Sequence, residues 1–248
     1  LGERGHNRCA SSTRIIRAAA SLTNHLPSRI RTHTYLYGLS TGLRKLPALS
    51  LVTASNNLFG PAGIMEYNPR NTDKHGPAWE RPVSAEFIRL EDNGGFQLDA
   101  GLRVQGGGYI RSLYNYTLGP PQGKYSFRLY FRGEYGEGRL DYPWFLNTTV
   151  DSFNTVVLRA GQNDHTNPYI RDELARQLAG DVGQPTSHGT LVNFFLNGVY
   201  KGYYNPVERI TTDFLQAYHG GLNDWDVIGS VSELQDGDLT AWNQLMTQ

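Results

Sequence analysis

The segment 124–132, KYSFRLYFR, alternates strictly between apolar and polar side chains. A period of two is that of a β-strand with one buried face. The apolar face consists of Tyr125, Phe127, Leu129 and Phe131. The opposite face consists of Lys124, Ser126, Arg128, Tyr130 and Arg132. The pattern therefore predicts a strand of an antiparallel sheet with a row of cations along its polar face.

A second strand is predicted just before this one. Leu102 and Val104 alternate with Arg103 and Gln105, and the segment runs into three consecutive glycines, Gly106–Gly108. Two interpretations stay open at this point. The glycine connection and the cations could bind a phosphate-bearing ligand, or the pair could be an ordinary antiparallel sheet with one solvated face.

The amino-acid composition of the chain excludes several classes of protein. Lys plus Arg equals Asp plus Glu, 23 of each, so no global field favours nucleic acid. The single cysteine, Cys9, allows neither an internal disulfide nor a Cys/His zinc site. No apolar run is long enough to span a membrane. The N-terminus lacks an initiator Met and the apolar core of a signal peptide, so we expect an excerpt from a longer chain.

The rest of the chain alternates between strands and a few helices. Asn93-Gly94 and Asn197-Gly198 predict hairpin turns, because Asn and Gly accept positive φ. Strands are expected at 13–22, 30–35, 46–53, 84–90, 96–105, 153–160, 191–196, 199–204 and 225–229. Helices are expected at 167–183, 211–219 and 239–246. For 13–22 the alanines leave a helix as the alternative.

The helix at 167–183 has the clearest signals. Asn167 is a candidate cap, and Pro168 occupies the first helical position. An apolar stripe recurs every four residues, at Ile170, Leu174 and Leu178. Asp172 lies about 200° around the helix from Ile170, so we expect it to face solvent.

Several motifs together resemble one family. They are GLRVQGG, KYSFRLYFR followed by YG, VVLRAGQND, IRDELARQL and FFLNGVYKGYYNPVER. In this order they are similar to the CotH (spore coat protein H) kinase family, in particular its large secreted bacterial members, over residues 46–248. The resemblance implies an α+β fold: a protein-kinase-like small lobe, made of an antiparallel sheet and one main helix, and the start of a large lobe. Residues 1–37 resemble the end of a chitobiase-type β-sandwich module, and 38–45 would be a linker.

The resemblance implies ATP and Mg²⁺ as cofactors, a Ser/Thr-containing protein as substrate, and a secreted or cell-surface location. Lys124 or Arg128 would contact phosphate, with Glu173 as the partner on the helix. Glu173 could equally be a first-turn residue that complements the helix dipole. The candidate nucleotide-binding residues are Arg103, Gly106, Gly107, Gly108, Arg111, Lys124, Arg128, Glu173 and Glu208.

Other candidates also have an ordinary structural alternative. The glycines would let the backbone approach phosphate, or they form a tight bend. Arg111 would reach phosphate from the glycine loop, or lie in solvent. Glu208 would border the adenine pocket, or form a surface ion pair.

The family's catalytic and metal-binding aspartates belong to an Asn-x-Asp-Trp motif and an Asp-x-Asp motif, and we expect both after Gln248. Two similar stretches, 223–226 (NDWD) and 236–238 (DGD), do not fit. The first follows the hinge too soon and lacks the spacing, and the second is typical of a turn. We therefore predict no catalytic or metal-binding residue in this chain, and a fragment that is inactive alone.

Two other functions are possible on the residues alone. The 15 tyrosines and Trp79 and Trp144, expected to be exposed, would suit a non-catalytic surface protein that binds carbohydrate or adheres to cells. A glycosidase would need paired carboxylates. Glu134, Glu137 and Asp141 are candidates, but their positions follow no such pattern.

Overall fold

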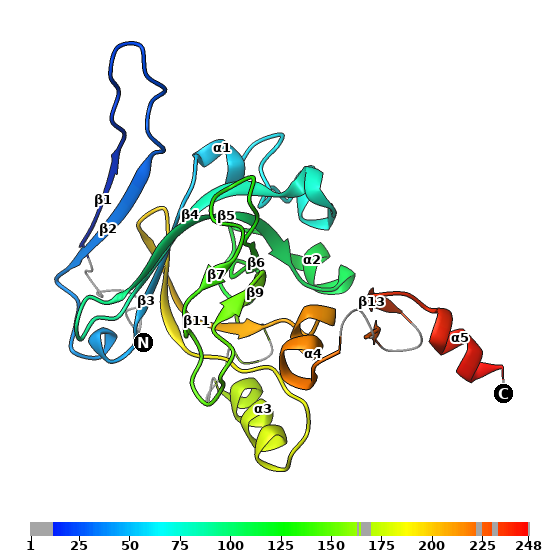
Figure 1. Cartoon of the computed structure of the whole chain (residues 1–248). Helices are drawn as coiled ribbons and strands as arrows, with labels where there is room; N and C mark the ends of the chain where they lie inside the picture. Colours follow the sequence, from blue (N-terminus) through cyan, green and yellow to red (C-terminus); the bar gives the residue numbers. More distant parts are fainter. Residues whose placement is uncertain (1–11, 163, 165–169, 222–224, 230–232, 248) are drawn as a thin grey trace, which may run out of the picture.

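Seven strands form a sheet that closes on itself in the computed structural model, which describes residues 12–162, 164, 170–221, 225–229 and 233–247 (Figure 1). In spatial order the strands are β10 (Val192–Leu196), β11 (Val199–Glu208), β9 (Thr155–Arg159), β6 (Ser126–Tyr130), β5 (Gly95–Gln105), β4 (Arg81–Ile88) and β3 (Ala48–Val52). Neighbouring strands are antiparallel, except that β3 and β10 close the barrel as a parallel pair.

The interior of the barrel is the hydrophobic core. The apolar side chains of 124–132 point inward, as the alternation predicts, and Tyr125, Phe127, Leu129 and Phe131 are at most 3% exposed. Burying one such Phe or Leu side chain stabilises a fold by about 1.5–3 kcal/mol. Tyr125 also donates its hydroxyl hydrogen to the backbone oxygen of Met65, 3.0 Å away. The strand is therefore held to the segment that crosses this end of the core.

Two asparagines support the closing pair of strands. Asn193 Nδ2 donates to the backbone oxygens of Leu43 and Leu46, at 2.6 and 3.1 Å. Asn197 Oδ1 accepts from the backbone N–H of Thr53, at 2.8 Å. Asn197 and Gly198 have φ values of 48° and 77°, which confirms the predicted hairpin turn between β10 and β11.

The helices are few and short. They are α1 (Ser55–Leu58), α2 (Gly108–Leu113), α3 (Arg171–Asp181), α4 (Thr212–His219), α5 (Thr240–Met246) and the 3₁₀ turns η1 (Leu43–Lys45), η2 (Asn71–Asp73) and η3 (Pro77–Trp79). Thr211 caps α4, because its Oγ1 accepts from the N–H of Phe214. The described part of α3 is shorter than predicted, and the candidate cap Asn167 lies outside the described residues.

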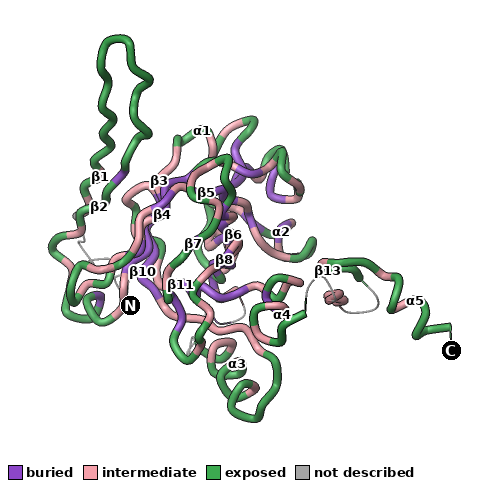
Figure 2. The backbone as a smooth tube through the Cα atoms, in the orientation of Figure 1, coloured by how far each residue is buried: buried purple, intermediate pink, exposed green. Residues whose placement is uncertain are grey.

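The apolar stripe on α3 does not pack against the core. Ile170, Leu174 and Leu178 are 43–55% exposed, and no residue of the helix is buried. Figure 2 shows the contrast: burial is concentrated along the barrel strands, whereas α3 and α5 are mostly exposed. Polar contacts, described below, hold α3 to the sheet instead.

A separate hairpin, β1 (Ser12–Ala18) and β2 (Arg31–Tyr37), projects from one side of the barrel (Figure 1). The alternative of a helix at 13–22 is therefore wrong. Thr34 attaches the hairpin: its Oγ1 lies 2.8 Å from Ser50 Oγ, and its backbone N–H donates to Glu86 Oε2 at 2.6 Å. Two further sheets have two strands each, β7 (Leu140–Asp141) with β8 (Ser152–Phe153) and β12 (Val227–Ile228) with β13 (Leu234–Asp236).

The α+β class predicted from the sequence is confirmed, with a sheet-rich core and little helix. The expectation of a single antiparallel sheet needs correction, because the sheet closes through a parallel pair. No helix among the described residues is long and apolar enough to cross a bilayer.

Candidate functional site

The polar face of the strand at 124–132 forms part of the outside of the barrel. Arg103 of β5 pairs with Arg128 of β6, which pairs with Val157 of β9. Val157 pairs in turn with Val207 of β11. One row of the outer face therefore carries two neighbouring arginines followed by two valines.

Three arginines surround the ring of Tyr130 on this face. The guanidinium carbons of Arg103, Arg132 and Arg128 lie 4.3, 5.0 and 5.4 Å from the ring centre. We call Arg103, Arg128 and Arg132 the arginine cluster. Glu80, whose side chain is 1% exposed, is the carboxylate partner of two of them, at 2.6 Å from Arg103 and 3.1 Å from Arg132. One buried carboxylate facing three cations leaves the cluster with a positive charge.

Arg128 has no carboxylate partner among the described residues. Its Nη1 donates to the Tyr130 hydroxyl at 2.9 Å, and its Nε is buried without an acceptor. Burial lowers the pKa of the guanidinium, because the charged form loses hydration. An anion beside Arg128 would restore the lost stabilisation of its charge.

A cavity of about 370 Å³ opens beside the cluster. It lies between the outer face of β6 and β9 on one side and the start of α4 and β13 on the other. Its lining residues are mostly polar: Arg128, Tyr130, Phe131, Arg132, Asn154, Thr155, Arg209, Thr211, Thr212, Asp213, Gln235 and Asp236. Arg209, which follows β11, adds another cation.

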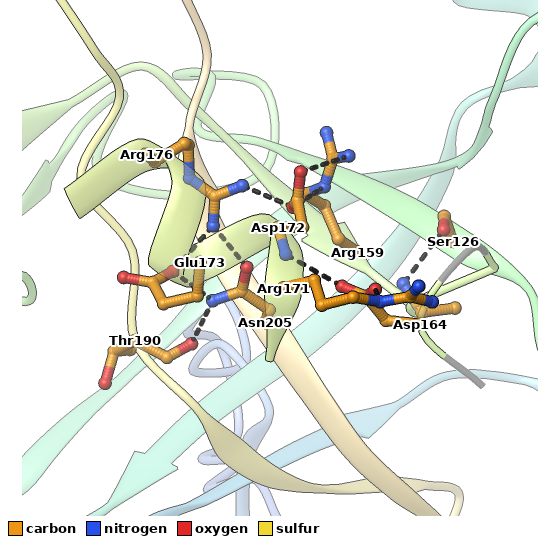
Figure 3. A network of polar contacts seen from close by, with 10 residues as sticks. Ser126, Arg159, Asp164, Arg171, Asp172, Glu173, Arg176, Thr190 and Asn205 are labelled. Carbon is orange, nitrogen blue, oxygen red and sulfur yellow. Dashed lines mark hydrogen bonds and ion pairs between the residues drawn. The ribbon is translucent and has the colours of Figure 1, made fainter. Parts of the chain in front are cut away.

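At the other end of β9, a polar network joins the sheet to α3 (Figure 3). Arg159 Nε lies 2.7 Å from Asp172 Oδ2, and Arg176 also binds Asp172. Asp172 thus binds two arginines, while its side chain stays 39% exposed, as expected in part. Asp164 supports the start of the helix, since its Oδ2 accepts from the N–H of Asp172 at 2.9 Å.

Glu173 takes part in the same network. It binds Arg176 Nη2 at 2.6 Å and accepts from Asn205 Nδ2 at 2.8 Å. Its ionic partner is therefore on its own helix, rather than one of the two cations proposed on the strand at 124–132. Periodicity did not identify Arg159, Arg176 or Asn205, although Arg159 lies in the motif VVLRAGQND.

Lys124 is directed away from the cavity. Its Nζ donates to the backbone oxygen of Tyr203 at 2.7 Å and lies 4.2 Å from the centre of the Tyr203 ring. Burial lowers the pKa of this ammonium group to about 8. Of the two cations that the sequence offered for phosphate, Arg128 is the one that faces a cavity.

The three glycines do not form a simple loop between two strands. Gly106 has a φ of 142°, which favours glycine, and the chain then enters α2 directly. Arg111 of this helix is buried, which contradicts its predicted place in solvent. Its donors are engaged with the backbone oxygens of Thr72 and Lys74, both at 2.5 Å, and with His75 Nδ1 at 2.7 Å.

Glu208 is also buried, at 5% exposure, so a surface ion pair is wrong. It ends β11, where Oε2 accepts from the N–H of His188 and contacts His188 Nδ1, both at 2.8 Å. Oε1 accepts from the Tyr218 hydroxyl at 2.8 Å. Glu208 thus joins the segment before β10 to helix α4.

The structure weakens the two alternative functions. Trp144 is only 4% exposed and belongs to the core, and Trp79 is partly buried against it. Glu134, Glu137 and Asp141 are exposed, and Asp141 accepts from Ser152 Oγ. They line none of the cavities described here.

The two stretches that resemble the family's aspartate motifs are 223–226 and 236–238. Residues 222–224 lie outside the described part of the chain. In the other stretch, Gly237 has a φ of 81° and forms a bend. Asp236 accepts from Thr212 N–H, and Asp238 accepts from Thr240 N–H. Within the described ranges, no group of three His, Cys, Asp or Glu side chains could hold a metal ion.

Comparison with sequence models of protein families gives a match. The sequence model of the CotH kinase protein family matches residues 121–246, which is half of the 248-residue chain. The matched part includes β6, β9, α3 and the hairpin β10–β11, but begins after Arg103 and the three glycines. The comparison with curated proteins found no match.

Proposed function

Because this chain belongs to the CotH kinase family, we propose that it is the nucleotide-binding part of an ATP-dependent protein kinase. The proposal includes Mg²⁺ as a cofactor, a Ser/Thr-containing protein as substrate, and a secreted or cell-surface location. The observation that carries it is the ion pair between Arg159 of β9 and Asp172 of α3.

The order of elements supports this interpretation. In protein kinases a glycine-rich segment joins the first strands, a lysine on the third strand pairs with a glutamate of the next helix, and these groups position ATP. Here β5, the glycines, β6 and β9 precede α3, and the hairpin β10–β11 follows. Arg159 and Asp172 occupy the corresponding strand and helix. This part of the barrel would be the kinase-like small lobe.

Phosphate binding requires a cation that neutralises the phosphate oxygens and a group that holds this cation in place. Arg159 would neutralise phosphate oxygens, and Asp172 would hold Arg159 in place against the helix. Bound Mg²⁺ would supply further neutralisation. The described residues do not fit a metal site, because they contain no cluster of candidate ligands.

ATP binding tests the proposal. Arg159→Ala should weaken Mg-ATP binding at least tenfold in calorimetry or NMR titration. Folding should be little affected, because this pair is 47% and 39% exposed and exposed pairs contribute about 0–1 kcal/mol. Arg29→Ala, an exposed arginine of the β1–β2 loop, is the matched control. Equal ATP binding by Arg159→Ala and wild type would refute the proposal.

We also propose that residues 1–248 alone do not transfer phosphate, since the described residues supply neither a metal cluster nor an assigned catalytic base. A phosphotransfer assay with Mg-ATP checks this. Turnover that disappears in Asp224→Ala would show that the chain carries its own catalytic aspartate.

A further inference from the structure

The cavity beside the arginine cluster has more cations than its carboxylates can neutralise. Arg128, Arg132 and Arg209 line it, together with Asp213 and Asp236. Arg132 shares the buried Glu80 with Arg103. Neither Arg128 nor Arg209 has a carboxylate partner among the residues that the structure places.

Both aspartates of the cavity are already engaged by other groups. Asp213 accepts from Asn154 Nδ2 and lies 4.0 Å from Arg139. Asp236 accepts from the N–H and the hydroxyl of Thr212, at 2.9 and 3.0 Å. Three arginines line the cavity against these two carboxylates, so positive charge is in excess there.

From this arrangement we propose that the cavity binds an oligophosphate anion through Arg128, Arg132 and Arg209, without a metal ion. Arginine matches phosphate oxygens with two parallel donors. An oligophosphate carries several charges, which suits three guanidinium groups better than one carboxylate would. The cavity volume of about 370 Å³ lies within the range of small-molecule sites.

This site is separate from the Arg159 end of the sheet. Thr155 lines the cavity, and Arg159 is four residues further along the same strand, roughly 13 Å away at the usual rise per residue. The inference therefore stands independently of the proposed function. The anion could be a free oligophosphate or the phosphate chain of a nucleotide, and the experiment distinguishes these sources.

Tripolyphosphate binding in EDTA at low salt tests the inference, by calorimetry on residues 1–248. Arg209→Ala should weaken binding at least tenfold. Arg209 has no hydrogen bond or ion pair to other described residues, so its removal should leave the thermal midpoint unchanged. Arg132→Ala, whose side chain is 43% exposed, should weaken binding as well. Arg29→Ala and Arg159→Ala should bind as wild type does.

Three results would overturn the inference. They are no tripolyphosphate binding by wild type, unchanged binding by Arg209→Ala, or an equal loss in Arg159→Ala. If ATP displaces bound tripolyphosphate, the site takes the phosphate chain of a nucleotide. If both bind together, it takes free oligophosphate. Loss of ATP binding in Arg159→Ala with intact tripolyphosphate binding separates this site from the one in the proposed function.

Discussion

Lys124 and Arg128 lie four residues apart in the alternating segment 124–132, but only Arg128 belongs to β6, and their surroundings differ. Lys124 donates to the backbone of β11 and contacts two tyrosine rings. Arg128 faces the cavity and contacts Tyr130. Both are desolvated, and burial lowers both pKa values. At the residue scale, equivalent positions in the alternation thus have different chemical roles.

The buried ammonium of Lys124 should make stability depend on pH. Its pKa falls from 10.5 to about 8 on folding, so between these pH values the unfolded chain binds a proton that the folded chain lacks. The free energy of unfolding should therefore rise from pH 8 to 10.5, by at most about 3 kcal/mol. Urea unfolding over this range measures the effect.

Lys124→Met should remove this rise, whereas Lys45→Met, at an exposed position, should retain it. Parallel pH profiles for Lys124→Met and wild type would contradict the assignment.

At the scale of elements, α3 is held by charge rather than by apolar contact. Its apolar stripe is exposed, and its inner side binds Arg159 and Asn205 through Asp172, Glu173 and Arg176. Two of the ion pairs in this network differ in burial. The side chains of Arg176 and Glu173 are 13% and 12% exposed, whereas Arg159 and Asp172 are far more accessible.

This difference in burial predicts that losing the two ion pairs destabilises the chain by different amounts. Arg176→Met should destabilise the chain by about 2–4 kcal/mol, because it leaves Glu173 buried without its cation. Arg159→Met should cost less than about 1 kcal/mol, as exposed ion pairs do. Chemical unfolding of the two variants at pH 7 provides the comparison. Similar losses would mean that the burial of the two pairs does not determine their contributions.

At the scale of the whole molecule, the closed barrel and the β1–β2 hairpin contribute differently to stability. Closure leaves the sheet without an unpaired edge, and its interior holds the hydrophobic core. The hairpin meets the barrel through a few polar contacts, such as Thr34 with Ser50 and Glu86. The core should therefore not depend on the hairpin.

A chain that begins at Gly38 should retain the barrel. Ser50 and Glu86 would become hydrated when the hairpin is removed, so no buried polar group would lose its partners. The loss of stability should be about 2–5 kcal/mol, because the hairpin makes at least five hydrogen bonds to the barrel. Circular dichroism and urea unfolding of the shortened chain test this. A chain that is unfolded or aggregated at 25 °C would show that the hairpin is part of the core.

Local patterns predicted much of the fold. Alternation located the strands around Phe127, Asn197-Gly198 located the β10–β11 hairpin, and the helix expected at 211–219 is α4. The same reasoning failed for α3, because periodicity reports which side chains are apolar and not whether another element covers them. It also failed for Arg111, whose partners Thr72 and Lys74 are remote in sequence.

For the site, the sequence by itself determined that cations line one face of the strand at 124–132, because the two faces of a strand follow from a period of two residues. Only the tertiary structure decided which cation faces a cavity. Arg128 became the cavity residue because Arg209 and the start of α4 lie opposite it, whereas Lys124 meets a carbonyl of β11. The sequence likewise did not determine that β3 and β10 close the barrel as a parallel pair. Such pairings depend on contacts between residues far apart in the chain, and no local pattern encodes them.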